Sequence, residues 1–229
     1  MMVQPTDHLR RSFIYRQLSA AGAEFVDHAN AAVANKFSNE GDATKLGLAD
    51  LSPLPRTGFK GPEALAWLTE HDIEVPSLNN TAKPQSDNSL VVRLADTEGL
   101  VLSDLESKTE TVARLETLVP TPGCYPVPRS DTYFWFLLSG VHAPDCLLKI
   151  CGVDVRPKNF PNLTVAQTSI ARLGTIAIRD DRGSTLAYHL IADSTSAGYF
   201  WDAMLDAMAE FDGRPIGLNS LLALSGRVK

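Results

Sequence analysis

The stretch TYFWFLLSGVHAPDCL, residues 132–147, contains the unit from which this chain is built. Its first half, Thr132 to Ser139, is rich in aromatic and aliphatic residues and predicts a buried strand. Gly140 follows, and the segment from about Ala143 to Cys151 predicts a helix. Strand, glycine and helix in this order predict an α+β fold.

The same order of elements occurs about 80 residues earlier in the chain. Arg56 to Lys60 predicts a strand, and Gly61 precedes a predicted helix from Ala64 to Glu70, which the proline at position 62 favours because it lies near the first turn. Superposing Gly61 on Gly140 places Ala64 on Ala143. Two such units predict an internal pseudo-repeat rather than a solenoid, whose repeats are shorter. We expect one domain over residues 46–229, with pseudo-repeats at about 46–125 and 126–222.

Further elements follow from hydrophobic patterns and turn residues. Two strands joined by the turn Asp96-Thr97-Glu98-Gly99 are expected in the first repeat, and a second hairpin turns at Asp180 to Ser184. The stretch from Leu78 to Ser89 is expected to be a loop, because it is rich in turn-forming residues. The remaining predicted strands cover residues 89–94, 99–102, 163–173, 175–179 and 185–191, and the remaining helices residues 108–118 and 194–211.

Residues 1–45 are expected to form an N-terminal helical segment. Residues 9–37 contain spaced apolar residues among many alanines, which is typical of an amphipathic helix. Arg10, Arg11 and Arg16 lie in its first half. Two interpretations stay open for these arginines: a solvated helix face, or a docking segment for an acidic partner.

Composition limits the class of protein. The chain has 229 residues, of which 44% are hydrophobic and 21% charged, as in ordinary globular proteins. Its formal charge is −6, and the absence of a dense basic block argues against nucleic acid as a partner. Apolar runs are far shorter than the roughly 20 residues of a membrane span, and the N-terminus has no secretory signal. We therefore expect a cytoplasmic protein that has no membrane partner.

The cysteines and histidines predict no metal site. Cys124, Cys146 and Cys151 are odd in number and form no Cys-x-x-Cys pair, which argues against a disulfide scaffold. No histidine has the spacing to a cysteine that zinc ligands show. The chain also lacks a P-loop, a strand-linked G-x-G-x-x-G, H-E-x-x-H and G-x-S-x-G.

The order and spacing of several short segments resemble the glycine-cleavage T-protein (aminomethyltransferase) superfamily, which binds tetrahydrofolate. The resemblance covers roughly residues 46–222. Its segments are Leu48-Ala49-Asp50-Leu51-Ser52, Gly61-Pro62-Glu63-Ala64, Ile178 to Gly183, Tyr188-His189-Leu190, Tyr199 to Leu205 and Pro215-Ile216-Gly217-Leu218. It implies a folate-binding-type α+β fold with an internal pseudo-repeat, and the length of the chain implies that the C-terminal β-barrel of full-length aminomethyltransferases is lacking.

This short form resembles the gamma subunit of heterotetrameric sarcosine oxidase and related dimethylamine monooxygenase subunits. The resemblance implies an accessory subunit of an amine-demethylating oxidoreductase complex, which passes the one-carbon product (formaldehyde) to tetrahydrofolate. Its partners are then the flavin- or haem-bearing subunits of the complex, and no haem, flavin or metal is expected in this chain. Two alternatives stay open: a free-standing tetrahydrofolate-dependent one-carbon transferase, and a structural subunit that has lost ligand binding.

Aminomethyl transfer requires an acid/base carboxylate near the reacting nitrogens of the pterin. In the family this aspartate lies in a turn of the first repeat, where the chain offers Asp87, Asp96 and Asp104. Asp104 follows a predicted strand and is the candidate that the resemblance favours. The alternative role for Asp104 is a carboxylate at the start of a helix.

The resemblance also places folate-site positions at Arg179, Arg182, Tyr188 and His189. His189 stands where the family has the glutamate that grips the pterin, and Arg182 stands at a tyrosine position. Histidine lacks the bidentate geometry that a carboxylate offers to a guanidine-like edge. The late arginine that holds the folate tail has no clear counterpart, since Leu221 and Leu222 occupy that region and Arg227 lies beyond it.

Overall fold

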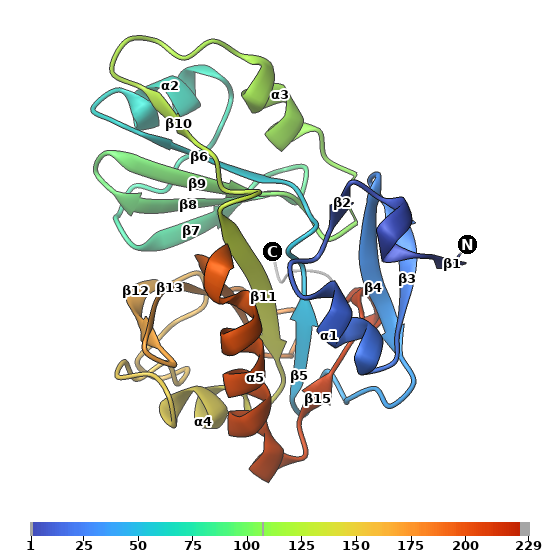
Figure 1. Ribbon diagram of the computed structural model, residues 1–229. Helices are drawn as coiled ribbons and strands as arrows, with labels where there is room; N and C mark the ends of the chain where they lie inside the picture. The colour runs from blue at the N-terminus through green and yellow to red at the C-terminus, as the bar shows by residue number, and fades with distance from the viewer. Residues whose placement is uncertain (1, 107, 225–229) are drawn as a thin grey trace. The chain divides into compact units, whose positions relative to one another are not determined.

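The computed structural model describes residues 2–106 and 108–224 (Figure 1). The chain divides into two compact units. Unit 1 comprises residues 1–53, 133–162 and 166–229, and unit 2 comprises residues 54–132 and 163–165. The division predicted at residues 45 and 125 follows the sequence repeat and stays a prediction.

Unit 1 contains a six-stranded sheet in the order β12-β13-β14-β11-β5-β15. Its central strand β11 pairs antiparallel with both neighbours, β14 and β5. The strands are β5 (Gly47–Asp50), β11 (Tyr133–Ser139), β12 (Val165–Ile170), β13 (Leu173–Arg179), β14 (Ala187–Asp193) and β15 (Arg214–Pro215).

Helices α4 (Ala143–Leu148) and α5 (Ala197–Met208) cover one face of this sheet (Figure 1). Phe134 and Phe136 of β11 contact Phe200 of α5, with ring centroids 4.8 and 6.1 Å apart. Short 3₁₀ turns extend α5 at both ends, over Ser194–Ser196 and Ala209–Phe211, so the helix predicted over residues 194–211 is confirmed.

The helix predicted over residues 9–37 is wrong. Only α1 (Tyr15–Ala20) is helical there, and the rest contributes to a four-stranded sheet. Gly22, at φ 82°, ends α1, and a two-residue turn at Ala29 and Asn30 joins two of the strands. Tertiary pairing therefore overrides the helix propensity of the alanines, since Ala31, Ala32 and Ala34 are buried in a strand. The strands, in sheet order, are β1 (Met2–Val3), β3 (Ala23–His28), β4 (Ala31–Phe37) and β2 (Arg10–Arg11); α6 (Leu218–Ala223) also contacts β4.

Unit 2 contains a five-stranded sheet in the order β10-β6-β9-β8-β7. The loop predicted over residues 78–89 is wrong in part, because β7 lies within it and pairs with β8. Pro84 is tolerated there because β7 is an edge strand. The elements are β6 (Arg56–Lys60), β7 (Thr81–Pro84), β8 (Leu90–Ala95), β9 (Glu98–Leu102), β10 (Tyr125–Val127), α2 (Ala64–Glu70) and α3 (Thr111–Thr117).

The two sheets confirm the predicted α+β fold and its internal pseudo-repeat. Strands β10-β6-β9-β8-β7 of unit 2 correspond in order to β5-β11-β14-β13-β12 of unit 1. Gly61 and Gly140 both have positive φ, 125° and 115°, between the strand and the helix of their repeat. In each case the glycine carbonyl accepts a 3.1 Å hydrogen bond from the N–H of the first helical residue, Ala64 or Ala143.

The helices of the described residues are all short, and none has the length and apolar character needed to cross a membrane.

Candidate functional site

A chain of polar side chains lies on the face of the six-stranded sheet opposite α4 and α5. His189 of β14 is directly opposite Leu137 of β11 and Ile178 of β13. Because side chains alternate between the two faces of a sheet, His189 shares its face with Trp135 of β11. Asp180 follows the last residue of β13 and also reaches this face.

The distances define one connected network. Trp135 Nε1 donates to His189 Nδ1 at 2.9 Å, and His189 Nε2 lies 3.0 Å from Asp180 Oδ2. Arg182 Nη2 donates to the same Asp180 oxygen at 3.0 Å. Since the indole offers only a donor, Nδ1 of His189 must accept, and the imidazole proton therefore resides on Nε2 and points to Asp180.

Burial makes this network costly to leave incomplete. The side chains of Asp180 and His189 are each 1% exposed, and that of Arg182 is 11% exposed. A buried carboxylate needs a paired cation and hydrogen-bond donors, and Arg182 and His189 supply them. Both nitrogens of the His189 ring are engaged within the protein. The arrangement holds a proton in place rather than presenting it to a ligand.

The other two predicted folate-site residues lie on the helix-covered face. Arg179 is directly opposite Tyr188, and Tyr188 belongs to the core beneath α4 and α5. The Tyr188 hydroxyl donates to the Val155 carbonyl at 2.8 Å, and burial raises the pKa of this phenol. The four predicted residues therefore form two pairs on opposite faces of the sheet, and their role in folate binding stays a prediction.

Arg179 is buried and engaged within unit 1. Its guanidinium donates to both carboxylate oxygens of Asp181, at 3.0 and 2.6 Å, and to the Phe160 carbonyl at 2.7 Å. The pair with Asp181 is bidentate, and the bond to the Phe160 carbonyl joins the end of β13 to the segment that precedes β12.

The sequence analysis missed Asp180 and the role of Trp135 in this network. A signal for Asp180 was present: a hairpin over residues 173–193 places residues 180, 187 and 189 on one face, which pairs the aspartate with His189. Trp135 is 54 residues from His189 in the sequence, and only the pairing of β11 with β14 brings them together.

Asp104, the predicted catalytic candidate, lies in the loop before α3. Its two carboxylate oxygens accept the backbone N–H groups of Lys108 and Thr109, at 3.3 and 3.2 Å. These contacts hold the loop that precedes α3, whose N-cap is Glu110, so Asp104 does not cap the helix. The catalytic role of Asp104 stays a prediction. Arg227, considered for the folate tail, is outside the described residues.

Cys146 is not an activated nucleophile. All three cysteines are free and buried, and burial raises the pKa of Cys146 to about 12. A thiol with so high a pKa carries almost no thiolate at neutral pH. In the part of the chain that the structure describes, no group of three or more histidine, cysteine or acidic side chains is placed to hold a metal ion.

Comparison with known proteins identifies relatives of the fold. Residues 14–225 match the family model described as GCVT N-terminal domain. The fold is similar to that of glycine cleavage system aminomethyltransferase T from Bartonella henselae, with a TM-score of 0.75 and 14% identity. That match covers 94% of this chain and 62% of the other, so this chain spans less than two thirds of that relative's length.

The fold is also similar to a chain of the heterotetrameric sarcosine oxidase from Corynebacterium sp. U-96, in complex with pyrrole 2-carboxylate. Here the TM-score is 0.68 with 16% identity, and the match covers 89% of this chain and 97% of the other. No curated protein matches the sequence.

Proposed function

This chain belongs to the GCVT N-terminal domain family, and from that premise we propose that it is an accessory subunit of an amine-demethylating oxidoreductase complex, of the sarcosine oxidase or dimethylamine monooxygenase type. In this proposal the partner subunits carry the flavin or haem that oxidises the N-methyl group. This chain then organises the partners and does not itself catalyse oxidation.

The observation that carries the proposal is the extent of the structural match. The fold is similar over 89% of this chain to a chain of a heterotetrameric sarcosine oxidase, with a TM-score of 0.68. That neighbour is one chain of a multi-subunit enzyme, which supports a subunit role for this chain. The alternative of a free-standing transferase stays open.

The geometry of the predicted folate site also supports a subunit role. A pterin edge presents neighbouring N–H donors, which a carboxylate grips with both oxygens. None of Arg179, Arg182, Tyr188 and His189 is a carboxylate, and Asp180, which two of them contact, is 1% exposed. The four residues as arranged do not fit a pterin edge. We therefore derive no step through tetrahydrofolate, and the transfer of formaldehyde to folate is not part of the proposal.

Purification of the tagged chain from its native cells tests the subunit role. We expect it to elute in a complex with a second polypeptide whose absorbance shows flavin or haem. Removal of this chain from the complex should abolish demethylation of a methylated amine. Elution of the chain alone, as a monomer, contradicts the proposal.

A calorimetric titration with tetrahydrofolate distinguishes the alternatives. We expect no binding heat from the isolated chain, because its four predicted positions are engaged within the protein. If the chain binds tetrahydrofolate and His189→Glu binds it more tightly, the chain would instead descend from a folate-dependent transferase and retain part of its folate site. Binding by the chain itself, lost in His189→Ala, would favour the free-standing transferase.

A further inference from the structure

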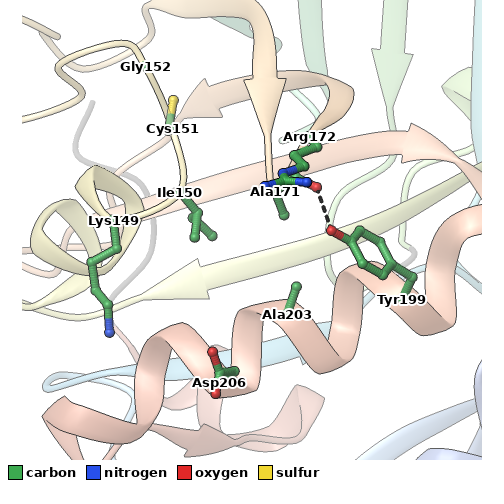
Figure 2. A pocket seen from close by; sticks show the side chains of 9 residues that line it. All are labelled: Lys149, Ile150, Cys151, Gly152, Ala171, Arg172, Tyr199, Ala203 and Asp206. Atoms are coloured by element: carbon green, nitrogen blue, oxygen red, sulfur yellow. Dashed lines mark hydrogen bonds between the residues drawn. The ribbon is translucent and has the colours of Figure 1, made fainter.

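A pocket of about 460 Å³ lies in unit 1, away from the Asp180 network. Three segments frame it: the end of α4 with the residues that follow, the turn between β12 and β13, and one face of α5 (Figure 2). The volume is within the range of small-molecule sites. Ile150, Ala171 and Ala203 form its apolar part.

The turn between β12 and β13 is held in an unfavourable conformation. Ala171 and Arg172 have φ values of 49° and 66°, as in a type I′ turn, whose positions favour asparagine and glycine. Two hydrogen bonds stabilise it. Tyr199 Oη donates to the Ala171 carbonyl at 3.1 Å (Figure 2). The Ala171 N–H donates to the Ile150 carbonyl at 2.9 Å. Strain of this kind is kept where the surrounding structure imposes it, and here it places an arginine at the edge of the pocket.

The pocket has one cationic and one anionic side chain that no other described side chain engages. Arg172 and Asp206 are both exposed, and neither makes a hydrogen bond or ion pair with another of the described residues. Lys149, by contrast, is engaged: its ammonium donates to the Ala207 carbonyl at 2.9 Å and pairs with Glu210 at 3.2 Å. A guanidinium and a carboxylate therefore remain to meet a ligand.

The spacing of these charges indicates the length of the ligand. Tyr199, Ala203 and Asp206 line the pocket from one face of α5, and Figure 2 shows Arg172 beside Tyr199. Seven residues of helix separate Tyr199 from Asp206, which is about 10 Å along the axis. A ligand that meets both charges must carry its own charges several bonds apart.

We propose that this pocket binds a small zwitterion of the ω-amino-acid or dipeptide class. Its carboxylate accepts two hydrogen bonds from the Arg172 guanidinium, its ammonium group pairs with Asp206, and its carbon chain lies on Ala171 and Ala203. This inference does not rest on the proposed function, since none of the pocket residues belongs to the Asp180 network or to the predicted folate positions.

Calorimetric titration of the full chain with 6-aminohexanoate tests the pocket. We expect 6-aminohexanoate and glycylglycine to bind, and hexanoate, hexylamine and glycine to bind at least about tenfold more weakly. Each of these three lacks one charge or the separation between charges. Equal binding of 6-aminohexanoate and hexanoate, or no binding of any of the five compounds, overturns the proposal.

Two variants test which side chain binds which charged group of the ligand. Arg172→Asn removes the guanidinium and relieves the turn, so we expect at least a tenfold loss of 6-aminohexanoate affinity together with a Tm raised by about 2 °C. Asp206→Asn should abolish the preference for 6-aminohexanoate over hexanoate. Lys158→Asn, which removes one exposed positive charge that lies outside the pocket, is the matched control and should bind like the natural chain. An Arg172→Asn variant that keeps its affinity overturns the proposal.

Discussion

The hairpins β8–β9 and β13–β14 occupy the same place in their sheets, so their side chains can be compared position by position. Arg93 of β8 corresponds to Arg179 of β13. Arg93 pairs with Gly99 of β9, and Arg179 pairs with Tyr188 of β14. Leu100, opposite Gly58, corresponds to His189, opposite Leu137. One position is thus apolar in the first repeat and an imidazole in the second.

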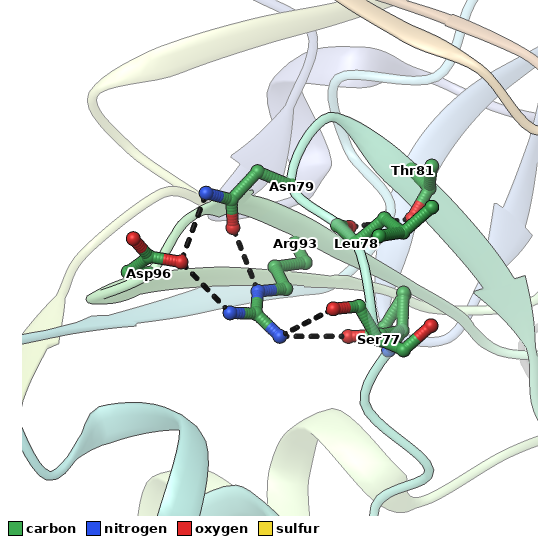
Figure 3. A network of polar contacts seen from close by, with 7 residues as sticks. Ser77, Leu78, Asn79, Thr81, Arg93 and Asp96 are labelled. Atoms are coloured by element: carbon green, nitrogen blue, oxygen red, sulfur yellow. Dashed lines mark hydrogen bonds and ion pairs between the residues drawn. The ribbon is translucent and has the colours of Figure 1, made fainter.

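Both repeats use their arginine to fasten the hairpin to the preceding loop. Arg93 donates to Asn79 Oδ1 at 2.7 Å, to Asp96 Oδ1 at 2.9 Å and to the Ser77 carbonyl at 2.9 Å (Figure 3). Arg179 makes a similar set with Asp181 and the Phe160 carbonyl, but here the asparagine, Asn162, accepts from the Asp181 N–H at 3.0 Å rather than from the arginine. The Arg–Asp–Asn combination therefore belongs to the repeated fold and explains why Arg179 is not free for a ligand.

The Asp180–His189–Trp135 network has no such counterpart. Leu94 and Leu100 stand at the positions of Asp180 and His189 in the first repeat, which reaches the same strand order without them. A buried carboxylate and imidazole cost desolvation that leucines do not. The comparison teaches that this network is an addition to the fold rather than a requirement of it.

Breaking the Asp180–His189–Trp135 network should have the largest effect on the stability of the protein. Asp180→Ala removes the acceptor of both Arg182 and His189, and we expect the free energy of unfolding to fall by about 3 kcal/mol, because a buried guanidinium and a ring N–H lose their partner. Urea unfolding followed by tryptophan fluorescence measures the loss.

The double variant Asp180→Leu, His189→Leu copies the first repeat and controls this prediction. We expect it to lose less stability than the sum of its two single variants, with a coupling of about 1 kcal/mol or more. Strictly additive losses would show that the two side chains do not act as one network.

Replacing the arginine of each repeat should have the next largest effect on stability, and a different one in the two repeats. Arg179→Met should cost about 2 kcal/mol and Arg93→Met about 1 kcal/mol. The reason is exposure: the side chains of Arg179 and Asp181 are 9% and 16% exposed, whereas those of Arg93 and Asp96 are 20% and 79% exposed. Urea unfolding of the two variants compares them, and an equal or greater loss in Arg93→Met contradicts the explanation.

The smallest expected effect concerns how the stability contributed by the first repeat depends on pH. Burial raises the pKa of Asp87, but hydrogen bonds from Thr109, Thr111 and Ser89 outweigh it and lower the pKa from 3.8 to about 2. A lowered pKa means that this contribution to stability is complete above about pH 4 and is lost as the pH falls towards 2. Leu173 stands at the corresponding position of the second repeat and cannot titrate.

Asp87→Asn should therefore unfold with a smaller decrease in Tm between pH 4 and pH 2 than the natural chain, by calorimetry at both pH values. Asp7→Asn, which changes an exposed aspartate elsewhere in the chain, is the matched control. Identical pH profiles for Asp87→Asn and the natural chain would contradict the role of these hydrogen bonds.

Much of the fold was readable from local signals. Gly61 and Gly140 marked the repeat, since only glycine adopts their backbone conformation without strain next to a helix start. The helix over residues 194–211 was likewise set by neighbours in the sequence. So was the hairpin turn, which the structure places at residues 96 and 97, since Glu98 and Gly99 of the predicted turn begin β9. The predicted helix over 9–37 failed because helix propensity is local, whereas pairing of β3 with β4 and burial of their alanines are not.

By itself the sequence determined the α+β class, the duplication and the family resemblance, because these depend on the order and spacing of residues. Only the tertiary structure decided what the candidate residues do. Arg179 and Tyr188 lie on one face of the sheet, and Arg182 and His189 on the other, where Asp180 and Trp135 complete a closed network. The physical reason is that hydrogen-bond partners of a buried side chain are chosen by strand pairing, which joins residues distant in the chain.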